Sequence, residues 1–105
     1  MKVDFYFDPG CPWCWVTSRW LDDVASQRDL NVSWKPFSLA MKNGTLSKAP
    51  EKHSDYDKSH LSGHRVLRVI EAAAQTDAER GKLYSDIGQM HHVDGYPYSD
   101  IEIEL

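Results

Sequence analysis

The chain has 105 residues, which suits one small domain and is too short for two. Hydrophobic residues make up 41% and charged residues 27% of the sequence, as in ordinary soluble proteins. The net charge is −4 and the 12 basic residues are scattered, so nucleic acid is not an expected partner. No apolar run approaches the roughly 18 residues of a membrane span, and the N-terminus lacks the zones of a signal peptide. We therefore expect a cytoplasmic protein with no membrane partner.

The first 40 residues follow a strand, helix, strand pattern. Residues 3–7 alternate apolar and polar side chains, which indicates a strand, and Pro9 and Gly10 end it. Apolar residues recur at helical spacing from about 13 to 28, and residues 31–37 form a second probable strand. A crossover of this length implies parallel strands. The turn after the first strand therefore lies where open α/β sheets place their ligands.

The rest of the chain is polar at first and then helical. Residues 41–60 are rich in Asn, Gly, Ser, Lys and Pro, which predicts a surface loop. Apolar periodicity predicts a helix at 64–75 and a further helix to about 90, capped by Thr76 or Asp77. The capping-box spacing at 99–102 predicts a third helix start. We divide the chain into an α/β half at 1–40, a loop at 41–60 and a helical part at 61–105.

Two cysteines, Cys11 and Cys14, stand two residues apart in the first turn of the first predicted helix. In a reducing compartment such a pair is more often catalytic or metal-binding than structural. Cys11 at the helix N-terminus would face unpaired N–H groups that stabilise a thiolate, which makes it the expected nucleophile. Cys14, one turn inside the helix, would be the resolving thiol. The Pro12-Trp13 spacer carries no cationic ring, unlike a spacer that contains His, so we expect a less oxidising centre than that of the periplasmic oxidants.

Two neighbours of the cysteines are candidate site residues. Asp8 would accept a proton when Cys14 attacks a mixed disulfide, or would serve only to cap the turn. Trp13 is expected to project beside the sulfur and offer a flat apolar contact to substrate. Trp15 and Trp20 are expected in the core.

Two other functions stay open at this point. Cys11 and Cys14 together with His60 and His64 form a two-cysteine, two-histidine set that could bind structural zinc, although 45 residues separate the pairs. Alternatively, the chain is a non-catalytic dimerisation module that buries an open sheet edge and apolar helix faces against a partner.

Four segments of the chain carry a family resemblance: Phe5-Tyr6-Phe7-Asp8-Pro9, Cys11-Pro12-Trp13-Cys14-Trp15, Thr17-Ser18-Arg19-Trp20 and Ser38-Leu39-Ala40. These segments resemble the DsbA-like thioredoxin-fold proteins, and above all their cytosolic actinobacterial branch of mycothiol-dependent nitroreductases. The resemblance covers nearly the whole chain, and its specific part is the first 40 residues.

The resemblance implies a thioredoxin-like βαβ unit followed by a helical insertion, with the C-terminal strands of the fold missing from this sequence. It also implies thiol-coupled reduction by the CPWC dithiol, with Asn43 near the active site and no tightly bound cofactor or metal. A low-molecular-weight thiol, mycothiol or glutathione, would return the electrons, and nitro compounds or protein disulfides would be reduced. A homodimer could complete the truncated fold.

Overall fold

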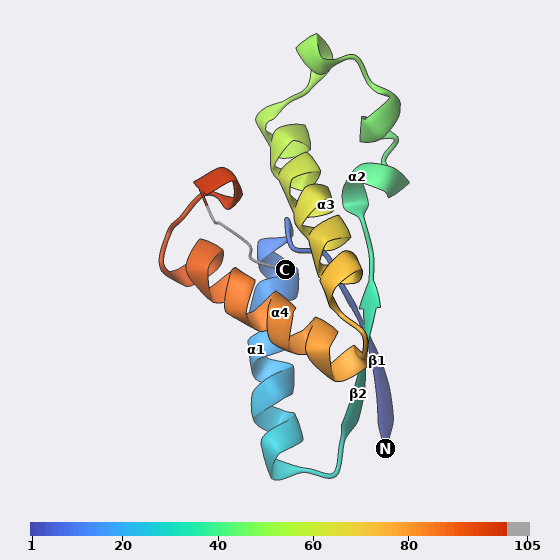
Figure 1. Cartoon of the computed structure of the whole chain (residues 1–105), viewed down its shortest axis with the longest axis vertical. Helices are drawn as coiled ribbons and strands as arrows, with labels where there is room; N and C mark the ends of the chain where they lie inside the picture. The colour runs from blue at the N-terminus through green and yellow to red at the C-terminus, as the bar shows by residue number, and fades with distance from the viewer. Residues whose placement is uncertain (101–105) are drawn as a thin grey trace.

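The computed structural model describes residues 1–100, and Figure 1 shows a βαβ unit joined to a set of helices. In chain order the elements are β1 (Lys2–Phe7), α1 (Pro12–Gln27), β2 (Asn31–Pro36), α2 (Leu39–Lys42), the 3₁₀ turns η1 (Thr45–Ser47) and η2 (Pro50–Lys52), α3 (Asp55–Ala73), α4 (Asp77–Gly88), the π-helical turn η3 (Gln89–Val93) and the 3₁₀ turn η4 (Tyr98–Asp100). In the described part of the chain, no helix is both long enough and apolar enough to cross a membrane.

The two strands form a parallel sheet, as the sequence predicted. Their register runs from Lys2 opposite Asn31 to Phe7 opposite Pro36. Pro36 closes the second strand, where its missing N–H removes no hydrogen bond from the interior of the ladder. Both strands therefore end at the same edge, and the turn that carries Cys11 begins there (Figure 1). The predicted α/β class and thioredoxin-like βαβ unit are confirmed.

A largely aromatic core joins the sheet to the helices. Phe7 of β1 is fully buried, and its ring centroid lies 4.8 Å from that of Tyr84 on α4. Helix α4 approaches closely because Gly81 and Gly88 face tryptophan rings: a Cβ there would lie 2.6 Å from atoms of Trp34 and Trp15 respectively. The buried cluster comprises Phe7, Trp15, Trp34, Val66, Leu67, Ile70, Tyr84 and Ile87. It includes residues from the predicted α/β half and from the predicted helical part, and the division of the chain into parts at 1–40, 41–60 and 61–105 stays a prediction.

Helix α1 uses a different face from the one its apolar spacing suggested. Its buried residues are Trp15, Ser18 and Leu21. The prediction that Trp15 is core is confirmed, whereas Trp20 is 63% exposed and its assignment to the core was wrong. Val16 is exposed as well. The Trp15 ring is buried because it packs against Gly88 of α4, where the missing side chain leaves room for it. The position of this small residue, and not the apolar spacing of α1 alone, therefore decides which face of α1 packs against the core.

Helix α3 starts earlier than predicted, at Asp55 and not at residue 64, so the expected loop at 41–60 contains the first turns of a helix. Ser54 caps the helix through its side chain, which accepts the Asp57 N–H, and the Asp57 carboxylate accepts the Ser54 N–H in return. This reciprocal pair is a capping box. The cap of α4 is Thr76, as predicted. The helix expected from residue 99 falls mainly on residues 101–105, which lie outside the described residues, and residues 98–100 form the 3₁₀ turn η4.

Candidate active site

The turn between β1 and α1 places Cys11 at the N-cap of the helix. The backbone at Cys11 is extended, with φ −104° and ψ 112°, and its N–H donates to the Asp8 carbonyl at 3.0 Å. Pro12 follows as the first helical residue, where its fixed φ suits the helix and its missing N–H costs no bond. No side chain caps this helix start. Cys11 therefore stands at the positive end of the α1 dipole, where the first N–H groups of a helix have no partner within the helix.

Cys14 lies one turn further into α1 and is held in the thiol form. Burial raises its pKa to about 11, although a hydrogen bond with the Asp8 backbone lowers it in part. A hydrogen bond with Cys11 and the negative charges of Cys11 and Asp8 raise the pKa further. Both cysteines are free and partly exposed.

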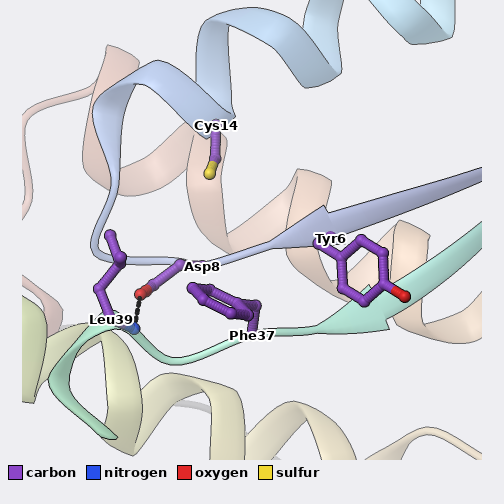
Figure 2. Close-up of a pocket in the computed structure, with 5 residues that line it drawn as sticks. All are labelled: Tyr6, Asp8, Cys14, Phe37 and Leu39. Carbon is purple, nitrogen blue, oxygen red and sulfur yellow. Dashed lines mark hydrogen bonds between the residues drawn. The ribbon is translucent and has the colours of Figure 1, made fainter. Parts of the chain in front are cut away.

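The Cys14 side chain faces a cavity of about 450 Å³ at the carboxyl end of the sheet. Figure 2 shows its sulfur pointing from α1 toward the two chain segments that leave β1 and β2. The walls are mostly apolar and come from the last residues of the strands and the start of α2. The lining residues are Tyr6, Asp8, Cys14, Phe37 and Leu39.

Asp8 joins the ends of the two strands through its carboxylate. Oδ1 accepts the N–H of Gly10 at 2.9 Å, and Oδ2 accepts the N–H of Leu39 at 2.7 Å (Figure 2). The residue is 1% exposed. These bonds fix the turn before Cys11 against the start of α2, so Asp8 has the capping role that the sequence allowed. Because the same residue lines the cavity with Cys14, its charge also acts on that thiol.

The other predicted neighbours lie outside the cavity. Trp13 is 79% exposed, so its ring is free to contact a molecule bound near Cys11. Asn43 is exposed at the C-cap of α2, where its N–H donates to the carbonyl of Leu39. It therefore stands one helical turn from the cavity wall without being part of it.

The four residues of the zinc hypothesis are not brought together as a ligand set. Nδ1 of His64 lies 2.8 Å from Oγ of Ser38, and His60 is buried beside Asp8 with its Nδ1 3.9 Å from Oδ2. Within residues 1–100, no group of three or more His, Cys, Asp or Glu side chains is arranged to hold a metal ion.

Sequence reasoning missed two residues that brace the turn from the other side. The Tyr98 hydroxyl donates to the carbonyl of Pro9, and Nε2 of His92 lies 3.3 Å from the same oxygen. The His92 ring stacks on Trp15 at 5.3 Å. Burial lowers the pKa of His92, and the neighbouring His91 adds to this, so the ring is held in its neutral form. The sequence signal was the run of His and Tyr residues that follows the helix predicted to end near residue 90.

This geometry can be compared with known proteins. A family model described as "Rv2466c-like: Mycothiol-dependent nitroreductase Rv2466c" matches residues 10–104. The chain belongs to the Rv2466c-like family. It is also 32% identical over 98 residues to the uncharacterized protein Rv2286c of Mycobacterium tuberculosis (strain ATCC 25618 / H37Rv). That match covers 91% of this chain and 41% of Rv2286c, so the chain spans less than half the length of this relative.

Proposed function

We propose that this chain carries a dithiol–disulfide exchange centre of a cytoplasmic, mycothiol-dependent reductase. The observation that carries the proposal is the pair of thiols at the start of α1: Cys11 stands at a helix N-cap, and Cys14 faces the cavity with its pKa raised to about 11. One thiol is thus placed to attack and the other is kept protonated until it is needed. Membership of the Rv2466c-like family supports the same chemistry.

The reaction has two steps. The Cys11 thiolate attacks a substrate, and Cys14 then attacks the Cys11 sulfur to form the internal disulfide. Conversion of two thiols into a disulfide releases two electrons and two protons. That amount reduces a substrate disulfide to two thiols, or a nitro group to a nitroso group with loss of water. Two molecules of a low-molecular-weight thiol return the dithiol to its reduced form and leave as their own disulfide.

Mycothiol is the proposed electron donor because the family model is described as mycothiol-dependent, and glutathione is the alternative. The proposed substrates are nitro compounds or protein disulfides. The exposed ring of Trp13 and the apolar cavity wall suit an aromatic or otherwise flat substrate better than a charged one. Asp8 lines the cavity with Cys14 and is the proposed acceptor of its proton.

The test is reversible oxidation of the chain by mycothiol disulfide, followed by mass spectrometry of the intact protein. We expect the parent chain to lose the mass of two hydrogens and to regain it on addition of mycothiol. Neither Cys11→Ser nor Cys14→Ser can form the internal bond. The same experiment with glutathione disulfide identifies the preferred thiol, because the disulfide of that thiol should oxidise the chain at the higher rate. A parent chain that stays reduced, while a reference dithiol is oxidised, would refute the proposal.

A second candidate is a dimerisation module, favoured by the exposed apolar face of α1. Trp13, Val16 and Trp20 are 79%, 60% and 63% exposed, and helical spacing puts them on one side. In this function a second copy covers the face and completes the fold. Sedimentation of the parent chain and of Val16→Ser distinguishes the two: a dimer that the substitution dissociates supports the module, and a monomer in both cases refutes it.

A further inference from the structure

His60 is a buried polar residue for which the two-step reaction has no role. It lies on α3, is 4% exposed, and its Nδ1 has no hydrogen-bond partner in the described part of the chain. A buried polar atom without a partner costs roughly 1–3 kcal/mol. Such a group calls for an explanation.

The acidic side chain that the structure places beside the His60 ring is Asp8. Nδ1 of His60 lies 3.9 Å from Oδ2 of Asp8, and both side chains are almost fully buried. Tyr56, one turn earlier on α3, packs edge-on against the imidazole with ring centroids 4.2 Å apart. Asp8 and Tyr56 are the titratable side chains whose contacts with His60 the structure describes.

The backbone of the same turn holds the imidazole close to the redox site. A Cβ on Gly10, next to Cys11, would lie 3.3 Å from the Cα of His60 and 2.9 Å from the carbonyl oxygen of Ser59. Helix α3 therefore lies directly against the turn, and its buried face presents the ring to the carboxylate. The Asp8 carboxylate in turn lines the cavity that Cys14 faces.

Resting on the proposed function, we propose that His60 holds a proton on Nδ1 toward Asp8 and is a positioning residue for the resolving step. It acts through the carboxylate and not by contact with the cysteines. The N–H dipole directed at the carboxylate weakens the field of Asp8 at the Cys14 sulfur and thereby makes it easier for Cys14 to lose its proton.

The electrostatic argument has a definite sign. A carboxylate near a thiol disfavours the thiolate, and Asp8 raises the pKa of Cys14 in this way. A hydrogen on Nδ1 of His60 that points at the Asp8 carboxylate reduces this rise in the pKa of Cys14. The reason is that the Cys14 sulfur then experiences the combined field of the carboxylate and the imidazole N–H. Loss of the imidazole therefore raises the pKa of Cys14, whereas loss of the carboxylate charge lowers it.

The step that His60 influences is balanced without another reactant. The S–H bond of Cys14 breaks and a bond forms between the sulfurs of Cys14 and Cys11. The bond from the Cys11 sulfur to the substrate sulfur breaks, and the substrate leaves as a thiolate. The proton released by Cys14 reaches that thiolate by way of Asp8, which returns to its carboxylate form. The cysteines are oxidised and the substrate sulfur is reduced.

The experiment measures Cys14 alone, in chains that carry Cys11→Ser. Burial still raises the pKa of Cys14 in these chains, so at pH 8 the rate of iodoacetamide alkylation is proportional to the small thiolate fraction. We expect His60→Gln to slow alkylation about threefold or more and Asp8→Asn to accelerate it. In a chain that already carries Asp8→Asn, adding His60→Gln should not change the alkylation rate of Cys14. His53→Gln is the matched control, because its ring contacts the carbonyls of Thr45 and Lys48, and it should react as the parent does.

Two results would overturn the proposal. One is an equal effect of His60→Gln with and without Asp8→Asn, which would make the ring a packing residue only. The other is an unchanged or faster alkylation rate in His60→Gln. Unfolding of that variant would also expose Cys14 and give a faster rate, so a measurement on the folded parent chain is needed as well. Nitrogen NMR of the unmodified chain therefore checks the ring directly: a protonated Nδ1 supports the proposal, and a bare Nδ1 refutes it. Neither measurement requires thiol exchange, so both can fail while the proposed function stands.

Discussion

Gly63 of α3 packs against Gly10 in the turn before Cys11, so closely that a Cβ on Gly63 would lie 2.5 Å from the Cα of Gly10. A Cβ there would also lie 3.0 Å from Oδ1 of Asp8. Glycine inside a helix costs about 1 kcal/mol relative to alanine, so its presence here is explained by the contact and not by helix formation. This contact between the two backbones holds α3 and the turn before Cys11 in a fixed relative position.

Gly63→Ala is expected to destabilise the chain, by about 1–3 kcal/mol, because the neighbouring atoms belong to backbone and cannot rotate away. Urea unfolding followed by circular dichroism measures the loss. Ala72→Gly, on the exposed side of α3, is the matched control and reports the helix-propensity cost alone. If Gly63→Ala instead stabilises the chain, as alanine does at an exposed helical glycine, the close packing is wrong.

Trp13 and Trp15 should differ sharply when each is replaced by alanine. Trp13 is 79% exposed, so Trp13→Ala should change stability by less than about 0.5 kcal/mol. It should still weaken turnover of an aromatic substrate, by up to roughly tenfold if the ring stacks on it. Trp15 is buried against Tyr84 and carries the Arg19 guanidinium over its ring at 4.2 Å. Trp15→Ala should cost about 3–5 kcal/mol. Equal melting temperatures for the two variants would contradict the assigned positions.

Asp57 should make stability depend on pH in acid. A hydrogen bond from Lys48, followed by one from the Ser54 backbone, holds the pKa of Asp57 below its ordinary value. A lowered pKa in the folded state contributes stability above the unfolded value, about 3.9, and that contribution disappears as pH falls through the folded value.

The measurement compares the urea midpoint of the parent chain and of Asp57→Asn at pH 6 and pH 3. We expect the variant to be less stable at pH 6 and the difference to shrink at pH 3. Asp55→Asn, exposed in the same helical turn, should have the smaller effect at pH 6. A difference that grows toward pH 3 would show that the carboxylate of Asp57 does not contribute as a charge.

The βαβ unit was predictable because its signals are local. Alternation in β1, the proline and glycine of the turn and the spacing of α1 all lie within a few residues of the structure they specify. The cysteine pair was found for the same reason, since its place at the helix start follows from the end of the strand. Membership of the Rv2466c-like family over residues 10–104 agrees with the family resemblance that these segments carried, and the role of the cysteine pair stays a prediction.

The start of α3 was missed because its buried face is not apolar. Asp57, His60 and Gly63 recur at helical spacing and are all buried, yet none of them is a large hydrophobic residue. A search for apolar periodicity therefore finds the helix only from Val66 onward. The capping box at Ser54 was a readable signal for the true start, hidden in a segment that looked like a loop.

The contacts around the turn depended on tertiary structure and had no local signal. His60 reaches Asp8 across more than fifty residues of sequence, and Tyr98 reaches Pro9 across 89. The same applies to Trp20, whose exposure follows from which side of α1 meets Gly88 of α4.

The most direct test of the central claim, that Cys11 attacks and Cys14 resolves, uses the two single-serine variants with mycothiol disulfide at pH 8. Peptide mass spectrometry then identifies the modified cysteine and its rate of modification. We predict that Cys14→Ser accumulates a lasting mycothiol adduct on Cys11. Cys11→Ser should react far more slowly, because burial, the main cause of the raised pKa of Cys14, is still present in that variant and keeps the thiol protonated. Equal rates in the two variants, or a faster adduct on Cys14, would contradict the account.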